Sequence, residues 1–246
     1  MGLESFTYNG INSIEHGVYL TQRTVWGAPR RSTTMIQVAG RSGDLTIDNK
    51  KYENVIVRYT GKCVAQNKYE FAEKLKAFRN ELCASVGYKR LTDTYNPDEY
   101  RLGVLNSDFN VESQFNNTAG TFEMEFNCKP QRFLVSGELE VALTGSNPTI
   151  SNPTLFSSKP LIKIKGIGTL GIGDWILTIT GTSSQTLYID CDMMEVYKNT
   201  GGIIEGANGL VTINKNEFPE LVSGVNNISV GSGLSNLVIT PRWWRL

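Results

Sequence analysis

Residues 54–84 read NVIVRYTGKCVAQNKYEFAEKLKAFRNELCA, and the change of pattern inside this stretch decides the fold. Over 54–65, apolar and polar side chains alternate, which is typical of a strand with one buried face. Over 67–84, the apolar side chains recur at spacings of four, three and four, so they form one stripe along a helix. The stripe consists of Phe71, Leu75, Phe78 and Leu82. We therefore expect one helix, over about 67–84, lying on a sheet.

Both ends of this helix carry the usual terminal signals. Asn67 is a plausible N-cap, because its short side chain can accept hydrogen bonds from the first free backbone N–H groups. Glu70 follows three residues later, as in a capping box. Gly87 is a plausible stop.

Working outward from the helix, the rest of residues 1–135 reads as short strands separated by turns. Alternating segments lie at 6–8, 18–20, 33–38, 88–93, 100–105, 109–115 and 121–128. A turn-rich piece, Gly40-Arg41-Ser42-Gly43-Asp44-Leu45, separates two of the early strands. This half is predicted to be an α+β domain, a β-sandwich of antiparallel sheets with one helix on them.

The character of the sequence changes over 136–158, where Ser, Asn, Pro and Gly become frequent and loop or edge structure is indicated. We place a domain boundary here, giving domains 1–135 and 136–246. The second domain reads as strands only, at 161–165, 176–180, 186–190, 194–198, 210–213, 227–230 and 237–240. Short strands with turns at this spacing favour a β-sandwich. The whole chain is thus predicted to be mainly β.

Charge and targeting signals narrow the class of function. The chain has 246 residues with 24 basic and 24 acidic side chains. Residues 1–135 carry 17 basic and 15 acidic groups, and 136–246 carry 7 and 9, so neither domain has the basic field that grips nucleic acid. The N-terminus lacks a secretory pattern, and no apolar run reaches the roughly 18 residues of a membrane span. We expect synthesis in a cytoplasm and no membrane insertion.

A search for chemistry finds no catalytic or cofactor site. The single histidine, His16, is expected on a surface turn and gives neither a zinc site nor a nucleophile–base pair. Glu123 and Glu125 share one strand face and are expected to be surface residues. Asp190, Asp192 and Glu195 are expected on a solvated turn, with a Ca²⁺ site as the less favoured alternative. The chain is predicted not to be an enzyme and to use no cofactor or metal.

Cysteines and glycines add no motif. The four cysteines, Cys63, Cys83, Cys128 and Cys191, show no C-x-x-C spacing and are expected in the core of a reduced protein. The stretch 166–171 fits G-x-G-x-x-G by letter, but it precedes a strand, so turns between strands are favoured over nucleotide binding.

Two aromatic residues are candidates for sugar binding or docking. Trp175 and Tyr188 begin or lie in predicted strands of the second domain, and an aromatic face can stack on a pyranose ring. For Trp175, packing in the core or at an edge is favoured. Trp243 and Trp244 alternate on a terminal strand, so at most one can face the core.

Several segments together resemble the distal tail protein (Dit) family of siphophages. In the first domain these are 19–21 before a long loop, the turn at 40–45, the strand and helix of 54–84, and Phe126-Asn127-Cys128-Lys129-Pro130. In the second domain they are 187–192, 218–221, 224–229 and the ending Ile239-Thr240-Pro241-Arg242-Trp243-Trp244-Arg245-Leu246. The resemblance spans nearly the whole chain in the expected order. One departure is Ser223-Gly224, where relatives often have Pro-Gly.

The resemblance implies a structural virion protein at the tail tip of a long-tailed phage or prophage. The N-terminal domain would form a hexameric ring with copies of itself, possibly ring on ring, and DNA would pass through it without specific binding. The C-terminal domain would be a galectin-like or carbohydrate-binding-module-like sandwich. Its partners would be the major tail tube protein and tail-associated fibre, lysin or receptor-binding proteins of the baseplate.

Two further expectations concern residues. Ring contacts are expected from N-terminal strand edges and from the loop over 24–33, which carries Trp26, Arg30 and Arg31. The alternative function is a carbohydrate-binding module for host attachment, which requires an exposed aromatic beside converging polar groups on one sandwich face. A tail-associated hydrolase is a third, weaker alternative, because it needs an acid–base pair in a cleft.

Overall fold

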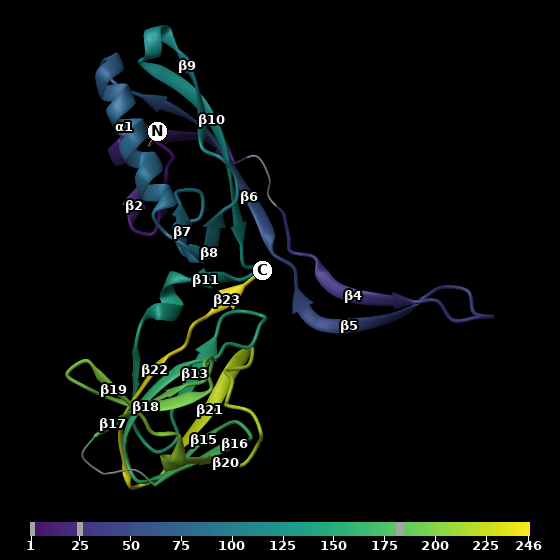
Figure 1. The fold of residues 1–246 in the computed structure, drawn as a ribbon. Helices are drawn as coiled ribbons and strands as arrows, with labels where there is room; N and C mark the ends of the chain where they lie inside the picture. The colour runs from purple at the N-terminus through teal and green to yellow at the C-terminus, as the bar shows by residue number, and fades with distance from the viewer. Residues whose placement is uncertain (1–2, 24–26, 181–184) are drawn as a thin grey trace. The chain divides into compact units, whose positions relative to one another are not determined.

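A computed structural model describes residues 3–23, 27–180 and 185–246 (Figure 1). The chain divides into two units: unit 1 comprises Met1–Arg132 with Leu246, and unit 2 comprises Phe133–Arg245. The boundary expected from the sequence falls after Val135. Among the described residues, no helix is long and apolar enough to cross a membrane.

Unit 1 is built on one antiparallel sheet with the strand order β2-β1-β7-β8-β10-β6-β3, and β9 also pairs with β10. The strands are β1 Phe6–Tyr8, β2 Ile11–Asn12, β3 Val18–Arg23, β6 Val55–Val64, β7 Lys89–Asp93, β8 Glu99–Leu105, β9 Asn110–Gln114 and β10 Ala119–Cys128. Short 3₁₀ turns occupy Ser13–His16 and Phe115–Asn117.

This single sheet corrects the sandwich expected for the first domain. β10 pairs with β6 along its whole length, and its other edge pairs first with β9 and then with β8, so the strands remain in one hydrogen-bonded layer. The far ends of the layer approach each other, because the N–H of Leu20 donates to the carbonyl of Glu4 at 2.8 Å. A curled sheet therefore encloses the core that a second sheet was expected to cover.

The helix α1, Lys68–Cys83, lies where the sequence predicts it. Its apolar stripe is buried in the core of unit 1. The Asn67 side chain accepts hydrogen bonds from the N–H groups of Tyr69 and Glu70 at 3.1 and 3.0 Å. The Glu70 carboxylate in turn accepts from the N–H of Gln66 at 2.9 Å. Unlike the standard capping box, this return bond reaches the residue before the cap.

Replacing Asn67 with alanine should lower the free energy of unfolding by about 1 kcal/mol, because two helix N–H groups lose their acceptor. Urea denaturation of the full chain measures this loss. Asn80→Ala, on the exposed side of the same helix, is the matched control and should cause no loss. Equal destabilisation by both variants would contradict a capping role for Asn67.

The core of unit 1 is rich in aromatic rings. Phe6 and Tyr59 stack at 5.5 Å between centroids, and Phe126 meets both rings edge-on. Gly61 interrupts β6 for a steric reason: a Cβ there would lie 2.2 Å from the carbonyl oxygen of Tyr19 and 2.5 Å from the Phe122 ring. The alternation of apolar and polar residues over 54–65 therefore breaks at Gly61, where the Phe122 ring leaves no room for a side chain.

Unit 1 also contains a two-stranded hairpin that we call the arm, formed by β4 Arg31–Ile36 and β5 Leu45–Tyr52. In Figure 1, neither face of this ribbon is covered by another strand or helix. The sequence predicted a strand at 33–38 and the turn after it but did not predict β5. It also placed Arg31 in a loop, whereas Arg31 begins β4.

Unit 2 is a sandwich of two antiparallel sheets, as expected for the second domain. One sheet has the order β12-β22-β14-β17-β18-β19 and the other β13-β21-β15-β16-β20. The strands are β12 Val141–Leu143, β13 Thr149–Asn152, β14 Leu161–Gly166, β15 Gly168–Ile172, β16 Trp175–Ile179, β17 Thr186–Asp190, β18 Glu195–Thr200, β19 Ile203–Gly206, β20 Val211–Ile213, β21 Gly224–Val230 and β22 Leu234–Thr240. β11 Arg132–Leu134 pairs with β23 Trp244–Arg245, and 3₁₀ turns lie at Val135–Glu138 and Asn208–Leu210.

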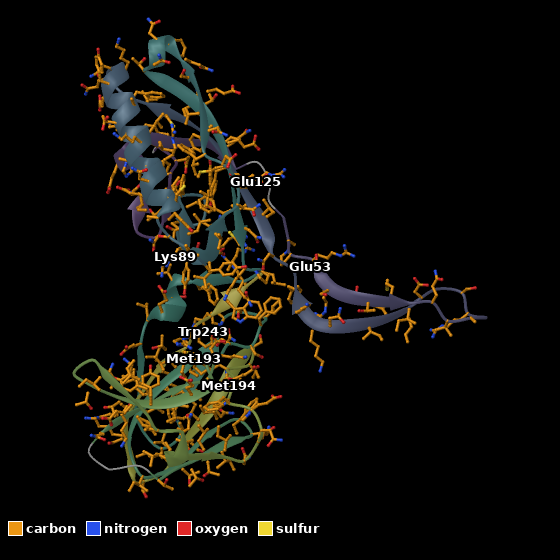
Figure 2. The ribbon with its side chains drawn as sticks, in the orientation of Figure 1. Glu53, Lys89, Glu125, Met193, Met194 and Trp243 are labelled. Atoms are coloured by element: carbon orange, nitrogen blue, oxygen red, sulfur yellow. The ribbon has the colours of Figure 1, made fainter. Side chains whose placement is uncertain are left out.

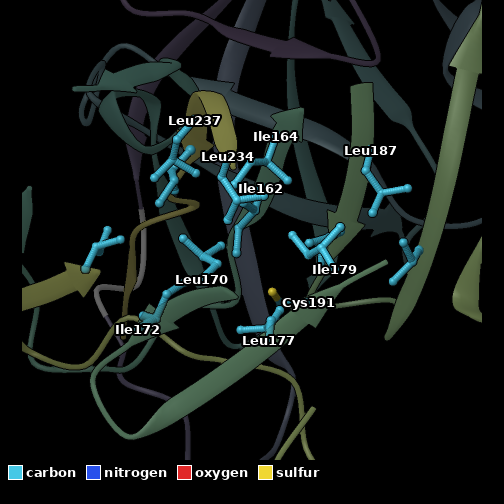
Figure 3. Packing of buried hydrophobic residues seen from close by; sticks show 14 of the residues in the cluster. Ile162, Ile164, Leu170, Ile172, Leu177, Ile179, Leu187, Cys191, Leu234 and Leu237 are labelled. Atoms are coloured by element: carbon cyan, nitrogen blue, oxygen red, sulfur yellow. The ribbon is translucent and has the colours of Figure 1, made fainter. Parts of the chain in front are cut away.

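The two sheets of unit 2 enclose a core of aliphatic side chains (Figure 3). Ile162 and Ile164 from β14 meet Leu170, Ile172 and Leu177 from the opposite sheet, and all five are essentially inaccessible to solvent. Ile162, Ile164 and Leu177 lie in strands that the period of two predicted. β15 corrects the expectation of turns over 166–171, because Gly168–Ile172 pair with β16 and β21.

The cysteines divide between core and surface. Cys63, Cys128 and Cys191 are buried, as expected, and burial raises the pKa of the Cys63 thiol to about 12. Cys83 corrects the prediction, because it is exposed. It is the last residue of α1 and falls one position after the buried Leu82, off the apolar stripe.

Candidate assembly surface

The arm exposes apolar side chains in register on one face. Ile36 pairs with Leu45 and Thr34 with Ile47, and residues directly opposite in an antiparallel pair point to the same side. Ile36, Leu45 and Ile47 are each about two-fifths exposed. A two-stranded hairpin with no covered face is marginally stable in water. This apolar face is therefore suited to burial against another chain.

The base of the arm is fixed by a polar network around Arg31. Its Nε donates to Asp48 Oδ1 at 2.9 Å, its Nη1 donates to the Tyr52 hydroxyl at 3.0 Å, and Nη2 pairs with the other Asp48 oxygen. Hydrogen bonds from Arg31 and from the N–H of Lys50 lower the pKa of Asp48 to about 2. The Asp48 carboxylate therefore keeps its charge, and its pairing with Arg31, into the acid range.

The three residues proposed for self-assembly have different settings. Trp26 lies outside the described residues. The backbone carbonyl of Arg30 accepts from the N–H of Glu53 at 2.9 Å, so Arg30 closes the base of the arm (Glu53 is labelled in Figure 2). Arg31 is engaged within its own hairpin. The residues that the sequence did not single out are the apolar ones, Ile36, Leu45 and Ile47.

A local signal for these residues exists in the sequence. The turn piece 40–45, with glycines at positive φ at Gly40 and Gly43, separates two runs in which apolar and polar residues alternate. Such a pattern is typical of a hairpin. The run Leu45-Thr46-Ile47 is short, and four polar residues, 48–51, follow it before β5 ends at Tyr52, so β5 is hard to recognise without its pairing.

The two candidate sugar-binding aromatics do not converge. Trp175 is in β16 and Tyr188 is in β17, which belong to different sheets of the sandwich. Trp175 packs against the core of unit 2, and the Lys215 ammonium lies 4.3 Å from its ring centroid.

The ring of Tyr188 has neighbours on both sides. It stands in a cross-strand row between Lys163 of β14 and Tyr197 of β18. The Tyr197 ring stacks on it at 5.2 Å with an interplanar angle of 10°, and the Lys163 ammonium lies 5.5 Å from its centroid. A sugar ring would have to displace one of these neighbours in order to stack on Tyr188.

The terminal tryptophans divide as the alternation requires. Trp243, labelled in Figure 2, is buried in the core of unit 2. Trp244 stacks on Phe156 at 4.5 Å, and its indole N–H donates to the carbonyl of Ser157 at 2.8 Å. Both side chains are thus used within unit 2.

Two of the charged residues considered for chemistry take part in ion pairs, and one of them, Asp190, is buried rather than solvated as expected. Asp190 holds Arg242 through two hydrogen bonds, of 2.7 and 2.8 Å, and also accepts from the N–H groups of Asp192 and Met193. Glu125 pairs with Arg58. No group of three or more metal-binding side chains occurs among the residues that the structure describes.

His16 corrects its prediction as a surface turn residue. Its side chain is only 14% exposed, its ring packs against Phe78 at 5.2 Å, and Nε2 lies 3.0 Å from a Glu81 carboxylate oxygen. The 3₁₀ turn of Ser13–His16 carries the imidazole onto α1, so it serves to attach that turn to the helix.

A curled sheet with one helix and an arm, followed by a β-sandwich, defines the class of structure to which this chain belongs, and known structures share it. The chain superposes on the SPP1 Dit protein, a paradigm of the hub adsorption apparatus in phages that infect Gram-positive bacteria, with a TM-score of 0.76, 11% identity and complete coverage of both chains. A chain of the phage P2 baseplate in its activated conformation with Ca matches with a TM-score of 0.56, 10% identity and 97% coverage of each chain. No protein-family model and no curated protein sequence matches the chain.

These likenesses establish the fold along the whole chain. The expected resemblance to the distal tail proteins is confirmed at that level: this chain has the fold of a phage tail hub and baseplate protein, and it is mainly β. Since the identity is near one in ten, most side chains differ between the two chains.

Proposed function

We propose that this protein is a distal tail protein, a structural hub at the tail tip of a long-tailed phage or prophage. Six copies form a ring that joins the tail tube to the host-adhesion apparatus, and DNA passes through the ring without specific binding. The full-length likeness to a hub protein of a phage adsorption apparatus supports the class of function. It also supports a non-enzymatic role and a position in the virion tail. Synthesis in the host cytoplasm is part of the proposal.

The observation that carries the ring proposal is the arm. Its apolar face has no cover within the described chain, and complete burial of a Leu or Ile side chain contributes roughly 1.5–3 kcal/mol. Covering the exposed two-fifths of Ile36, Leu45 and Ile47 on a neighbouring copy would therefore contribute about 1 kcal/mol for each residue at every contact. In a closed ring, each copy both provides an arm and receives one.

Unit 2 is the part proposed to dock other tail-tip proteins, such as a fibre, lysin or receptor-binding protein, while unit 1 meets the tail tube. Carbohydrate binding by a galectin-like sandwich is a weaker second proposal. The positions of Trp175 and Tyr188 on different sheets give it no shared aromatic platform.

Light scattering over a concentration series tests the ring proposal. We expect a mass of six times the 27.3 kDa chain, or twice that where two rings associate. A mass of one chain at every concentration would contradict autonomous ring assembly. Binding on a glycan array together with a monomeric mass would favour the carbohydrate-binding alternative.

A further inference from the structure

One edge of the sandwich in unit 2 is open for strand pairing. β13 is the first strand of its sheet, and its sole strand neighbour in the described part of the chain is β21. The carbonyls of Ser146 and Pro148 accept from β21, at Val230 and Ile228. Because bonding direction alternates along an antiparallel strand, the backbone groups of Thr149 and Ser151 point the other way. Both residues are exposed.

The loops beside this edge are held rigid by buried polar groups. Asn152, only 3% exposed, donates to the carbonyls of Phe156 and Leu221, both at 2.9 Å. Asn226 bonds the backbone of Val222 through both its amide oxygen and its amide nitrogen, at 2.8 and 2.9 Å. Fully bonded buried groups of this kind fix a single conformation.

Two apolar side chains near these buried amides face solvent. Leu155, in the loop after β13, is 88% exposed, and Val225, in β21 beside Asn226, is 65% exposed. A loop whose conformation is set in advance loses little entropy when it is covered. The surface formed by β13, Leu155 and Val225, here called the β13 edge, is thus prepared for a protein contact.

The β13 edge lacks charge. Residues 141–158 and 221–241, which include β12, β13, β21 and β22, contain no Lys, Arg, Asp or Glu. The edge strands on the other side of the sandwich are different: β19 contains Glu205, and Lys215 and Glu217 follow β20. Natural proteins commonly protect an open edge with charges, and this edge has none.

We propose that the β13 edge pairs with the β13 edge of a second copy about a two-fold axis. In such a contact residue i of one copy meets residue j of the other and j meets i, so a charge close to the axis would face a like charge. A long neutral surface satisfies this condition. Pro148 and Pro153 bound the strand on both sides, and they limit pairing to a segment of matching length, which an antiparallel copy of β13 supplies.

This contact is separate from the arm contact of the proposed ring, and the experiment keeps the two apart. The full chain carrying Ile36→Asp and Ile47→Asp loses the apolar face of the arm. In light scattering over a concentration series, the average mass of this variant should rise from that of one chain towards that of two. Adding Ser151→Lys should raise the dissociation constant of that dimer by at least about tenfold. Ser151 is exposed, so circular dichroism should show an unchanged fold.

Thr212→Lys provides the matched control, because Thr212 is also exposed and lies on β20, the other edge strand of the same sheet. It should leave the dimer unchanged. A single-chain mass for the arm variant at every concentration overturns the β13 pairing, as does equal weakening by Thr212→Lys and Ser151→Lys. A different result would reject the ring proposal alone. In that case the mass of the wild-type protein would never exceed that of two chains, and Ser151→Lys would reduce it to the mass of one chain.

Discussion

Replacement of Ile36 and Ile47 by aspartate should abolish assembly beyond a dimer. Both side chains lie on the apolar face of the arm, and the substitutions remove about 1 kcal/mol of apolar burial each. They also place two carboxylates where a neighbouring copy would exclude water, and an unpaired buried charge costs several kcal/mol. The dissociation constant of each ring contact should rise by more than about a hundredfold, since 1.4 kcal/mol corresponds to a factor of ten.

Thr46→Asp distinguishes the face of the arm from the arm as a whole. Thr46 pairs with Met35 on the opposite face and is exposed, so this variant places one carboxylate on the arm without touching the apolar face. Light scattering should show rings for Thr46→Asp and no rings for the double variant. If both variants lose the ring equally, the apolar face is not the contact surface.

The second large effect is expected at the ion pair between Asp190 and Arg242. The Asp190 side chain is 5% exposed and that of Arg242 32%. Arg242→Met leaves the carboxylate buried without its main partner, which should lower the free energy of unfolding by about 3 kcal/mol. Urea denaturation followed by tryptophan fluorescence reports on this unit, because Trp175, Trp243 and Trp244 all lie in it.

The same pair predicts how stability depends on pH. Burial of Asp190 acts to raise its pKa, but the hydrogen bonds from Arg242 and from the N–H groups of Met193 and Asp192 outweigh burial, and the pKa is lowered. A lowered pKa stabilises the folded state above the unfolded value of about 4, and this contribution is lost as pH falls through the folded value. Unfolding of the wild-type chain should therefore become easier below about pH 4, and Arg242→Met should weaken this dependence.

Asp174→Asn is the control for both measurements. Asp174 is 92% exposed and its carboxylate lies 3.9 Å from the Lys215 ammonium, so the pair is surrounded by water. Its loss should change neither the denaturation curve nor its pH dependence. If Arg242→Met and Asp174→Asn had equal free energies of unfolding, the buried pair of Asp190 and Arg242 would make no net contribution to stability.

The parts of the fold that sequence predicts well are those whose side chains meet a core. The α1 stripe of Phe71 and Leu75 and the alternation of β10 are set by burial, and burial imposes a period that can be read from the residues. The closure of the unit 1 sheet is different. The bond between Leu20 and Glu4 joins backbone groups of distant residues, and backbone groups leave no trace in the sequence.

The candidate assembly surface was harder to predict for a related reason. Arg31 and Trp26 draw attention by residue type, whereas Ile36, Leu45 and Ile47 look like ordinary core residues until the structure shows that nothing in the described chain covers them. Likewise, the neutrality of the β13 edge is visible in the sequence, but its meaning depends on which strands end each sheet.

The arm should also differ from the buried strands in local stability. Side-chain bonds within it, such as those of Arg31 with Asp48 and Tyr52, join residues of one short stretch of sequence. Its amide hydrogens should therefore exchange with solvent by local opening in a free subunit, long before those of the buried strands. In a ring, where a neighbouring copy covers the arm, the same amides should exchange with solvent slowly. The exchange rate of the arm amides therefore measures, for each subunit, whether it has assembled.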